Sequence, residues 1–193
     1  MRIIAGVHRG RSLKRPPAII TRPTMDRVRE AIFNMLTHGG WEGDKNIIEG
    51  AIVLDAFAGS GALALEALSR GAAFAYFFDQ SEQALAVVRQ NVKSLGEEER
   101  SKLLKTDACR PLKVLQAATL ILLDPPFGKD LLSKSLPGLF ESGWIAPNAL
   151  IMAEIQAKET YVLPANFEVL KEKIYGTAKV IFIKAPSEPS ISN

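Results

Sequence analysis

Short runs of hydrophobic residues alternate along the chain with longer segments in which hydrophobic residues recur every three or four positions. The short runs are typical of buried β-strands, and the longer segments are typical of amphipathic helices. Because continuous apolar strands alternate with helices, we expect a parallel sheet covered on both faces. The predicted strands in this region are 51–56, 73–78, 102–105 and 119–123, and the predicted helices are 62–70 and 81–96.

Particular residues mark the ends of several helices. Ser81 is expected to cap the helix that follows it, and Gly96 is expected to end that helix. A short helix is expected after Ala108. A further helix should start at about Asp130, and Pro137 with the glycine after it should break or kink that helix.

The last part of the chain is rich in strand signals. Residues 149–155 form an apolar run that predicts another strand, and 167–175 and 177–184 are separated only by Gly176. Two strands so close together predict a hairpin, which would add an antiparallel edge to the sheet. The expected fold class is therefore α/β, with a Rossmann-like, mostly parallel sheet and an antiparallel C-terminal hairpin.

The N-terminal region is expected to form a small arm followed by a helix. Segments 2–6 and 11–14 predict a small β arm that is too short to bury a core, so it must pack on the rest of the chain or on a partner. Prolines keep the next segment extended until Thr24 offers an N-cap. The apolar face of the predicted helix holds Val28, Ala31, Ile32 and Met35, and Arg27 and Arg29 are expected off it.

A glycine turn joins the strand that ends at Asp55 to the helix that starts at residue 62. Gly59 and Gly61 lack a Cβ, so the backbone there can adopt positive φ and approach a ligand closely, next to the free N–H groups of a helix N-terminus. We expect a small anionic or nucleoside-bearing ligand at this turn. The alternative is a sharp strand-to-helix connection that binds nothing.

Polar residues follow several of the predicted strands. Ligands of open α/β sheets bind beyond the carboxyl ends of the strands, so these residues should line one rim. The stretches are 55–61, 77–79, 107–108 and 124–127. The spacing of Gly59, Gly61 and Ala64, with Asp79 about 20 residues on, also fits a dinucleotide fingerprint. A nicotinamide-dependent oxidoreductase therefore stays open at this point.

The sequence Asp124-Pro125-Pro126-Phe127 favours a different chemistry. The two prolines fix the backbone, so the Pro125 carbonyl and the Asp124 carboxylate would stand side by side as acceptors for a planar exocyclic amine. Phe127 can lie over the ring that carries the amine. Accepting both N–H protons would aim the nitrogen lone pair at an electrophile held by the glycine turn. A rigid turn without chemistry is the alternative, and Cys109, which lacks an identifiable base, is a weak rival nucleophile.

Positive charge is concentrated at the N-terminus. The whole chain carries a formal charge of +3, whereas residues 1–30 contain eight basic and two acidic residues. Such a cluster suits a polyanion such as nucleic acid, although a solvated basic surface is the alternative. The candidate residues for binding a nucleic acid are Arg2, Arg9, Arg11, Lys14, Arg15 and Arg22.

The composition excludes several other classes of protein. A single cysteine cannot form an internal disulfide, and two histidines without a Cys/His cluster show no zinc spacing, so a metal-free site in a reducing compartment is expected. No apolar run approaches the length needed to cross a bilayer. We therefore expect a protein that is neither secreted nor embedded in a membrane.

A set of motifs, spread from the arm to the strand ends, is similar to one known family. The motifs are Arg2-Ile-Ile-Ala-Gly6, Arg9-Gly-Arg-x-Leu13, Arg22-Pro-Thr24, Asp26-Arg-Val-Arg-Glu-Ala-x-Phe-Asn34, Asp55-Ala-Phe-Ala-Gly-Ser-Gly-Ala-Leu63, Glu66-Ala-Leu-Ser-Arg-Gly71 and Asp124-Pro-Pro-Phe127. Together they resemble the RsmD family of class I S-adenosylmethionine-dependent methyltransferases. Members of this family are bacterial enzymes that methylate the N2 amine of a guanine in 16S ribosomal RNA.

The resemblance implies roles for individual residues. Asp124, Pro125, Pro126 and Phe127 would form the catalytic motif that holds the target guanine. The implied cofactor-binding residues are Asp55, Ala56, Phe57, Gly59, Gly61, Asp79, Asp107 and Ala108. The family usually places an acid for the cofactor ribose where this chain has Phe77. Asp79 either takes that role or, with Ser81, only caps the following helix.

The resemblance also implies an organisation and a partner. Residues 1–40 would dock RNA, 41–185 would form the methyltransferase domain and 186–193 would be a flexible tail. The glycines and mixed charges of 37–50 themselves predict a connecting loop, which is the candidate boundary between arm and core. The substrate would be 16S ribosomal RNA or a small-subunit assembly particle, and the enzyme a monomer in the bacterial cytoplasm. Transfer would be direct and in line, without metal or covalent enzyme intermediate, to a base unstacked from the RNA. The alternatives are another RNA or DNA amine as the target, or a non-catalytic RNA-binding assembly protein.

Overall fold

The structure is a computed structural model that describes residues 1–16, 23–41 and 46–187. Its helices are α1 (Pro23–His38), α2 (Ala62–Ser69), α3 (Glu82–Leu95) and α4 (Leu131–Glu141), with a 3-10 turn at Glu98–Arg100. Its strands are β1 (Ile52–Asp55), β2 (Phe74–Asp79), β3 (Ser101–Lys105), β4 (Ala118–Leu123), β5 (Ile145–Gln156), β6 (Glu168–Tyr175) and β7 (Ala178–Lys184). Within the described residues, no helix is long and apolar enough to cross a membrane.

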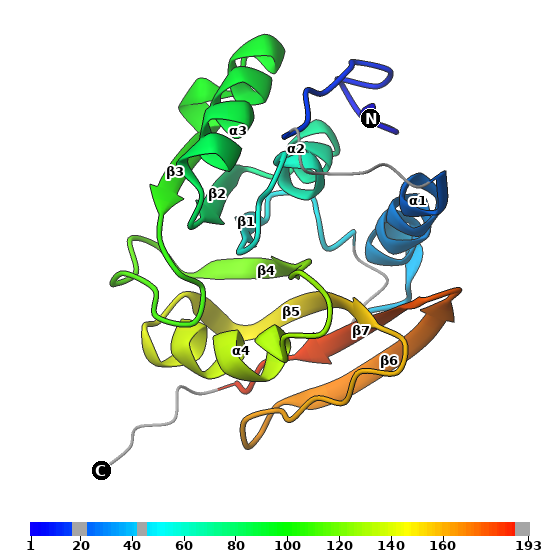
Figure 1. Cartoon of the computed structure of the whole chain (residues 1–193), viewed down its shortest axis with the longest axis vertical. Coiled ribbons are helices and arrows are strands. Elements are labelled where there is room, and N and C mark those ends of the chain that lie inside the picture. The colour runs from blue at the N-terminus through cyan, green and yellow to red at the C-terminus, as the bar shows by residue number, and fades with distance from the viewer. Residues whose placement is uncertain (17–22, 42–45, 188–193) are drawn as a thin grey trace.

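All seven strands form one sheet in the order β3-β2-β1-β4-β5-β7-β6 (Figure 1). The first five strands in this order are parallel, and β7 lies antiparallel between β5 and β6. This confirms the predicted parallel sheet with its antiparallel C-terminal hairpin. The chain builds outward from β1 to β3 and then returns to β4, so the topology switches between β1 and β4, where ligands of such sheets bind.

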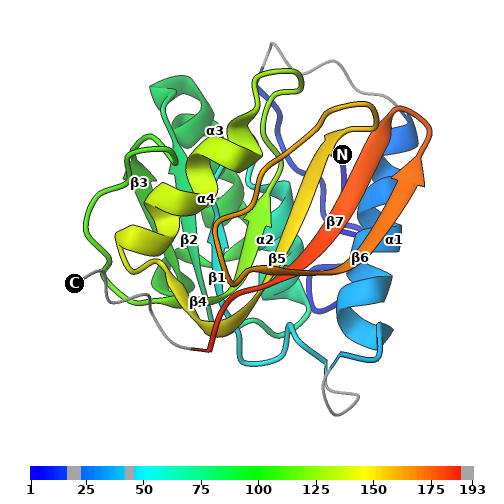
Figure 2. The ribbon, with the colours of Figure 1, turned by 90° about the horizontal axis from the view of Figure 1, so that it is seen from below.

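The core occupies both faces of this sheet. Helices α1, α2 and α3 pack on one face and α4 packs on the other (Figure 2). Successive residues of β4 point to opposite faces, so that Leu122 contacts the first cluster and Ile121 and Leu123 the second, and all three are fully buried. Burial on both faces explains why the strand is apolar at nearly every position.

The ends of α2 and α3 form as the sequence predicts. The Ser81 hydroxyl accepts a hydrogen bond from the Ala84 N–H at 3.3 Å, and Gly96 ends α3 with φ +73°. Gly61 precedes α2 with φ +78°, and a Cβ built there would lie 3.2 Å from both Phe77 and Val88. Gly61 therefore allows the start of α2 to pack closely on the core. It lies below the surface that a ligand could contact.

One local prediction is wrong, and one of two alternatives in another is ruled out. The segment after Ala108 forms a turn instead of a short helix, because the Asp107 carboxylate accepts the Cys109 N–H at 2.8 Å and so competes with helical bonding. Helix α4 runs through Pro137 to Glu141, so of the two predicted outcomes, a break or a kink, the break does not occur. A Cβ at Gly138 would lie 2.6 Å from the Cys109 carbonyl oxygen, so this glycine permits close packing of that turn on α4.

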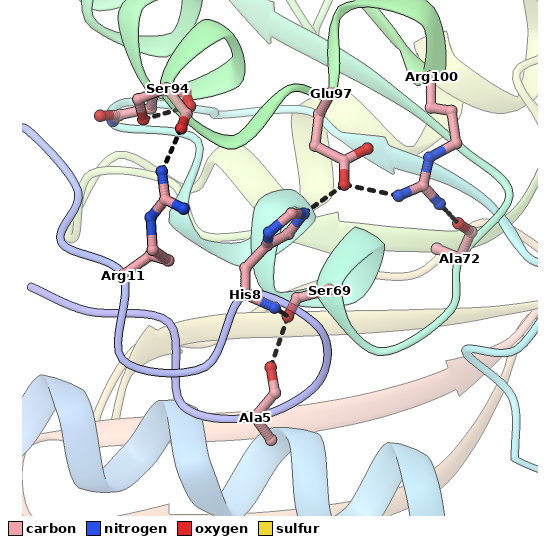
Figure 3. Close-up of polar contacts among 9 residues, drawn as sticks. Ala5, His8, Arg11, Ser69, Ala72, Ser94, Glu97 and Arg100 are labelled. Atoms are coloured by element: carbon pink, nitrogen blue, oxygen red, sulfur yellow. Dashed lines mark hydrogen bonds and ion pairs between the residues drawn. The ribbon is translucent and has the colours of Figure 1, made fainter.

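The N-terminal arm packs on α2, as Figure 3 shows in part. One antiparallel bridge joins Arg2 to Ser12. The fully buried Glu66 carboxylate accepts the N–H groups of Ile4 and Ala5 at 2.7 and 3.0 Å, and the Ser69 hydroxyl donates to the Ala5 carbonyl at 2.6 Å. The arm therefore packs on the rest of the chain, which is one of the two predicted alternatives, the other being a partner.

Contacts with α3 and the segment after it hold the far side of the arm. His8 Nε2 lies 2.5 Å from Glu97 Oε1, which also accepts a hydrogen bond from Arg100 (Figure 3). The Asn91 side-chain amide binds both backbone polar groups of Lys14. These buried acceptors fix the orientation of the arm relative to the sheet.

Helix α1 confirms most of its predicted apolar face. Val28, Ile32 and Met35 are buried, and Arg27 is exposed. The expectation that Arg29 lies off the buried face is wrong, because Arg29 is only 6% exposed and donates to the Arg2 carbonyl at 2.6 Å. Periodicity could not show this contact, since it depends on how the arm folds back. The predicted extended segment at 17–22 lies outside the described residues.

Candidate active site

A cavity of about 780 Å³ opens beyond the carboxyl ends of the parallel strands. All four predicted polar stretches contribute to its lining. The residues they contribute are Ala56, Phe57, Ala58, Gly59, Ser60, Asp79, Ala108, Asp124, Pro125, Pro126 and Phe127. Three residues of the predicted set do not line the cavity, namely Asp55, Gly61 and Asp107. They lie behind the residues that do.

Asp79 links the glycine turn to the start of α3. Its Oδ2 accepts the Gly59 N–H at 2.9 Å and its Oδ1 accepts the Ser81 N–H at 2.8 Å. Asp79 is the last residue of β2 and lines the cavity. It therefore makes the cap-like contact with Ser81 and also lies at the ligand site. Phe77 is fully buried in the core. The acid at the end of this strand is thus Asp79.

Asp55 supports the turn from below. The side chain is 1% exposed, its Oδ2 accepts the Ala64 N–H at 3.4 Å, and its Oδ1 has no hydrogen-bond partner. Burial raises the pKa of Asp55 to about 7. A carboxyl whose pKa is raised by folding destabilises the folded state when it ionises, so stability is lost here as pH rises from about 4 towards 7. A buried acid that carries this cost is typical of a functional site.

The Asp124 motif forms one wall of the cavity. Asp124 follows β4, and burial raises the pKa of its carboxyl. Pro125 is buried, whereas Phe127 is 42% exposed at the cavity edge. An acceptor, a rigid backbone and an accessible aromatic ring therefore meet in one place, as expected for binding a flat amine-bearing ring.

Glu154 on β5 is a cavity residue that the sequence reasoning missed. Leu123 of β4 pairs with Ala153 of β5, so Asp124 and Glu154 are the next neighbours in register. Burial and the nearby Asp124 charge raise the pKa of Glu154 to about 8. The available signal was an acidic residue near the end of an apolar strand, the same signal that identified Asp124.

Glu159 holds the loop that follows Phe127. Its Oε2 accepts the Gly128 N–H at 3.1 Å and its Oε1 accepts the Asp130 N–H at 3.0 Å. Asp130 has φ +53°, a conformation that a residue with a side chain adopts only at a cost. The Glu159 carboxylate therefore stabilises the strained loop 127–130, which begins with the exposed Phe127.

Replacing Glu159 with glutamine should loosen this loop, because the NH₂ group that replaces one carboxylate oxygen would face a backbone N–H that it cannot accept. Hydrogen bonds to a charged acceptor contribute ~1.5–3 kcal/mol, so the Gly128 and Asp130 amides should exchange with solvent about tenfold faster or more. Amide hydrogen exchange measures this directly. The exposed Glu168, replaced in the same way, is the control. Unchanged exchange in Glu159→Gln would show that the carboxylate does not hold the loop.

The basic candidates lie at the arm and beside the cavity. Arg2, Arg9, Arg11 and Lys14 are exposed, and Arg15 lines the cavity together with Arg29 and Met1. One of the exposed guanidinium groups, that of Arg11, donates to the Ser94 carbonyl at 2.6 Å. Arg22 lies outside the described residues. The arm thus borders the cavity and presents cations to solvent next to it.

Two further features of the described residues concern metal-binding groups and the Cys109 thiol. No group of three or more His, Cys, Asp or Glu side chains there could hold a metal ion. Burial, together with the Asp107 charge, raises the pKa of the Cys109 thiol. A protonated thiol is a poor nucleophile, which argues against covalent catalysis by Cys109.

This sheet order, with a cavity at the switch point between β1 and β4, defines the class I methyltransferase fold. A family model described as Conserved hypothetical protein 95 matches residues 1–184, so the chain belongs to that family, and the resemblance to the RsmD family is confirmed.

Relatives cover most of the chain. This chain is 37% identical to the ribosomal RNA small subunit methyltransferase D of Escherichia coli, over 91% of this chain and 85% of the relative. It is 35% identical to the protein of the same name from Haemophilus influenzae, over 91% and 89%. The solved structure of a candidate methyltransferase of Escherichia coli, yhhF, superposes with a TM-score of 0.80 at 33% identity, covering 97% of this chain and 99% of that one.

Proposed function

We propose that this protein transfers a methyl group from S-adenosylmethionine to the exocyclic N2 amine of a guanine in 16S ribosomal RNA. The observation that carries the proposal is that Asp124-Pro-Pro-Phe127 and the glycine turn line the same cavity. Relatives named as ribosomal RNA small subunit methyltransferases, which match nearly all of the chain, support the choice of substrate.

The cavity fits this cofactor in size and in chemistry. Its volume of about 780 Å³ is ample for a nucleoside-bearing ligand and a base. The turn from Ala56 to Ser60 would hold the methionine end, Asp79 the ribose hydroxyls and Ala108 the adenine. The sulfonium supplies an already activated methyl group, so the protein needs mainly to position and desolvate the reactants.

The catalytic motif would act on the amine. Asp124 and the Pro125 carbonyl accept its two N–H groups, and Phe127 stacks on the ring. As the N–CH₃ bond forms and the C–S bond breaks, the amine nitrogen becomes positive and passes one proton to the Asp124 carboxylate. Burial raises the proton affinity of that carboxylate, which favours this transfer.

The basic arm would hold the RNA in register. Contacts to phosphates position an RNA without reading its sequence, and the exposed arginines of the arm lie beside the cavity. We therefore assign RNA docking to residues 1–40, methyl transfer to 41–185 and no catalytic role to the tail at 186–193. We expect a monomer that acts on naked rRNA or on a small-subunit particle in the bacterial cytoplasm.

Removing positive charge from the arm should weaken RNA binding and flatten its salt dependence. Each phosphate that is no longer neutralised lowers the log–log salt slope by about 0.7 on single-stranded RNA, so replacing Arg9, Arg11 and Lys14 with alanine should lower it by about 2. Affinity for S-adenosylmethionine should not change. Alanine at the exposed Lys102, Lys113 and Lys173 removes equal charge elsewhere and is the control. An unaltered slope in the arm variant would make the arm a merely solvated surface.

The function is tested by transfer of a labelled methyl group from S-adenosylmethionine to 16S rRNA, supplied naked or in small-subunit particles. Digestion to nucleosides should yield labelled N2-methylguanosine. Labelled N6-methyladenosine or N4-methylcytidine would move the activity to another amine. Tight RNA binding without transfer to either substrate would instead favour a non-catalytic assembly protein.

A further inference from the structure

Glu154 is an acidic residue in the cavity to which the proposed chemistry gives no task. It lies on β5, next to β4, whose end carries Asp124. Residues paired in parallel strands point to the same face, and neighbouring strands lie about 4.8 Å apart. The register of Leu123 with Ala153 therefore places the two carboxyl groups side by side on one face at the edge of the sheet.

The other face-sharing acids already have N–H donors. Asp79 accepts two backbone N–H groups and Asp55 accepts one. By contrast, burial raises the pKa of Asp124, and burial together with repulsion from Asp124 raises the pKa of Glu154. Among the described residues, neither carboxyl group has a hydrogen-bond donor. Two such neighbours in one cavity suit a ligand that brings several N–H groups on one edge.

Guanine presents such an edge. Its N2 amine and the ring N1–H are both attached at C2, so a base held by Asp124 through the amine offers another donor two bonds away on the same edge. In adenine and cytosine the ring nitrogen beside the amine is an acceptor. An ionised carboxylate next to Asp124 would accept from guanine and repel the lone pair of the other two bases.

We propose that Glu154 is a specificity-determining residue that accepts the N1–H of the target guanine while Asp124 and Pro125 hold its N2 amine. This inference rests on the function proposed above and deepens it. It assigns the selection of guanine to a β5 residue outside the Asp124 motif. Ionised Glu154 selects a base with an N–H beside its amine, whereas protonated Glu154 can donate to a base with an acceptor there.

The test compares two rRNAs that carry either guanine or 2-aminopurine at the nucleotide found by modification mapping. 2-Aminopurine keeps the N2 amine but has an acceptor at N1. At pH 8.5 the unaltered protein should prefer guanine in kcat/KM by about tenfold to a hundredfold, the size of one polar base contact. The preference should shrink as pH falls below about 8, because the protonated carboxyl can donate to 2-aminopurine.

Glu154→Gln can donate to N1 at every pH, so it should lose the preference and its pH dependence. The other titratable or charged side chains lining the cavity are Arg15, Arg29, Asp79, Asp124, Lys129 and Tyr175. Their titration acts on both RNAs alike, since both carry the amine, and it cancels in the ratio. A merely structural role for Glu154 would likewise lower both rates equally.

Glu154→Ala is a second variant, whose side chain can neither donate to the base nor accept from it. It should also lose the preference for guanine. Binding of S-adenosylmethionine verifies that both variants are folded. The exposed Glu168→Gln is the matched control and should keep the full preference. A guanine preference retained in both Glu154 variants would overturn this proposal and leave the proposed function intact. If the unaltered protein does not methylate guanine, the proposed function itself fails.

Discussion

Replacing Asp124 with alanine should lower turnover by about 10²–10³-fold and change affinity for S-adenosylmethionine little. The carboxylate is expected to orient the amine and to take its proton, and these interactions strengthen as the nitrogen becomes positive. Loss of one preorganised polar partner of a developing charge has an effect of this size. Asp124 lines the cavity with Pro125 and Phe127, so the ring and the second acceptor remain in the variant.

Single-turnover methyl transfer and calorimetry with the cofactor separate the two expectations. The Glu168→Gln variant controls for the loss of a carboxylate elsewhere on the molecule. Near-normal turnover in Asp124→Ala would remove Asp124 from catalysis. An equal loss of cofactor affinity and turnover would instead make it a cofactor-binding residue.

Replacing Gly59 with valine should abolish binding of S-adenosylmethionine. Gly59 lines the cavity with φ +55°, and its N–H is bound to Asp79. A branched side chain there would both strain the turn and fill space that the cofactor needs. Calorimetry should detect S-adenosylmethionine and its demethylated product with the unaltered protein, and no binding of NAD.

Gly50→Val is a matched control for Gly59→Val, because Gly50 also has positive φ, at +71°, and a Cβ there would touch nothing within 4 Å. It carries similar backbone strain away from the cavity and should keep cofactor binding. Normal cofactor affinity in Gly59→Val would show that the turn does not approach the ligand. Binding of NAD in place of S-adenosylmethionine would return the oxidoreductase interpretation.

Features encoded within one segment could be predicted from the sequence. The apolar runs identify the buried strands because burial on both faces leaves few polar positions. Ser81 and Gly96 mark the ends of α3 through local backbone geometry. Asp124-Pro-Pro-Phe127 was recognisable because its acceptors and its ring are adjacent in the chain. Such patterns need no knowledge of which strands pair.

Features that depend on pairing between distant segments could not be predicted. Glu154 reaches Asp124 because β5 lies beside β4, and Glu159 reaches Gly128 across 31 positions. Glu66 resembles an ordinary helix residue in the sequence, yet it is the buried acceptor for the N-terminal arm. The side chains that complete the site are those whose partners are far away in sequence.

The central claim is that the protein methylates one guanine amine of 16S rRNA. Mass mapping of modifications in small-subunit rRNA, from cells with and without the protein, tests this claim most directly. We predict one N2-methylguanosine that is absent without the protein and returns when the unaltered protein, but not Asp124→Ala, is supplied. An identical modification map in the two kinds of cells would contradict the account.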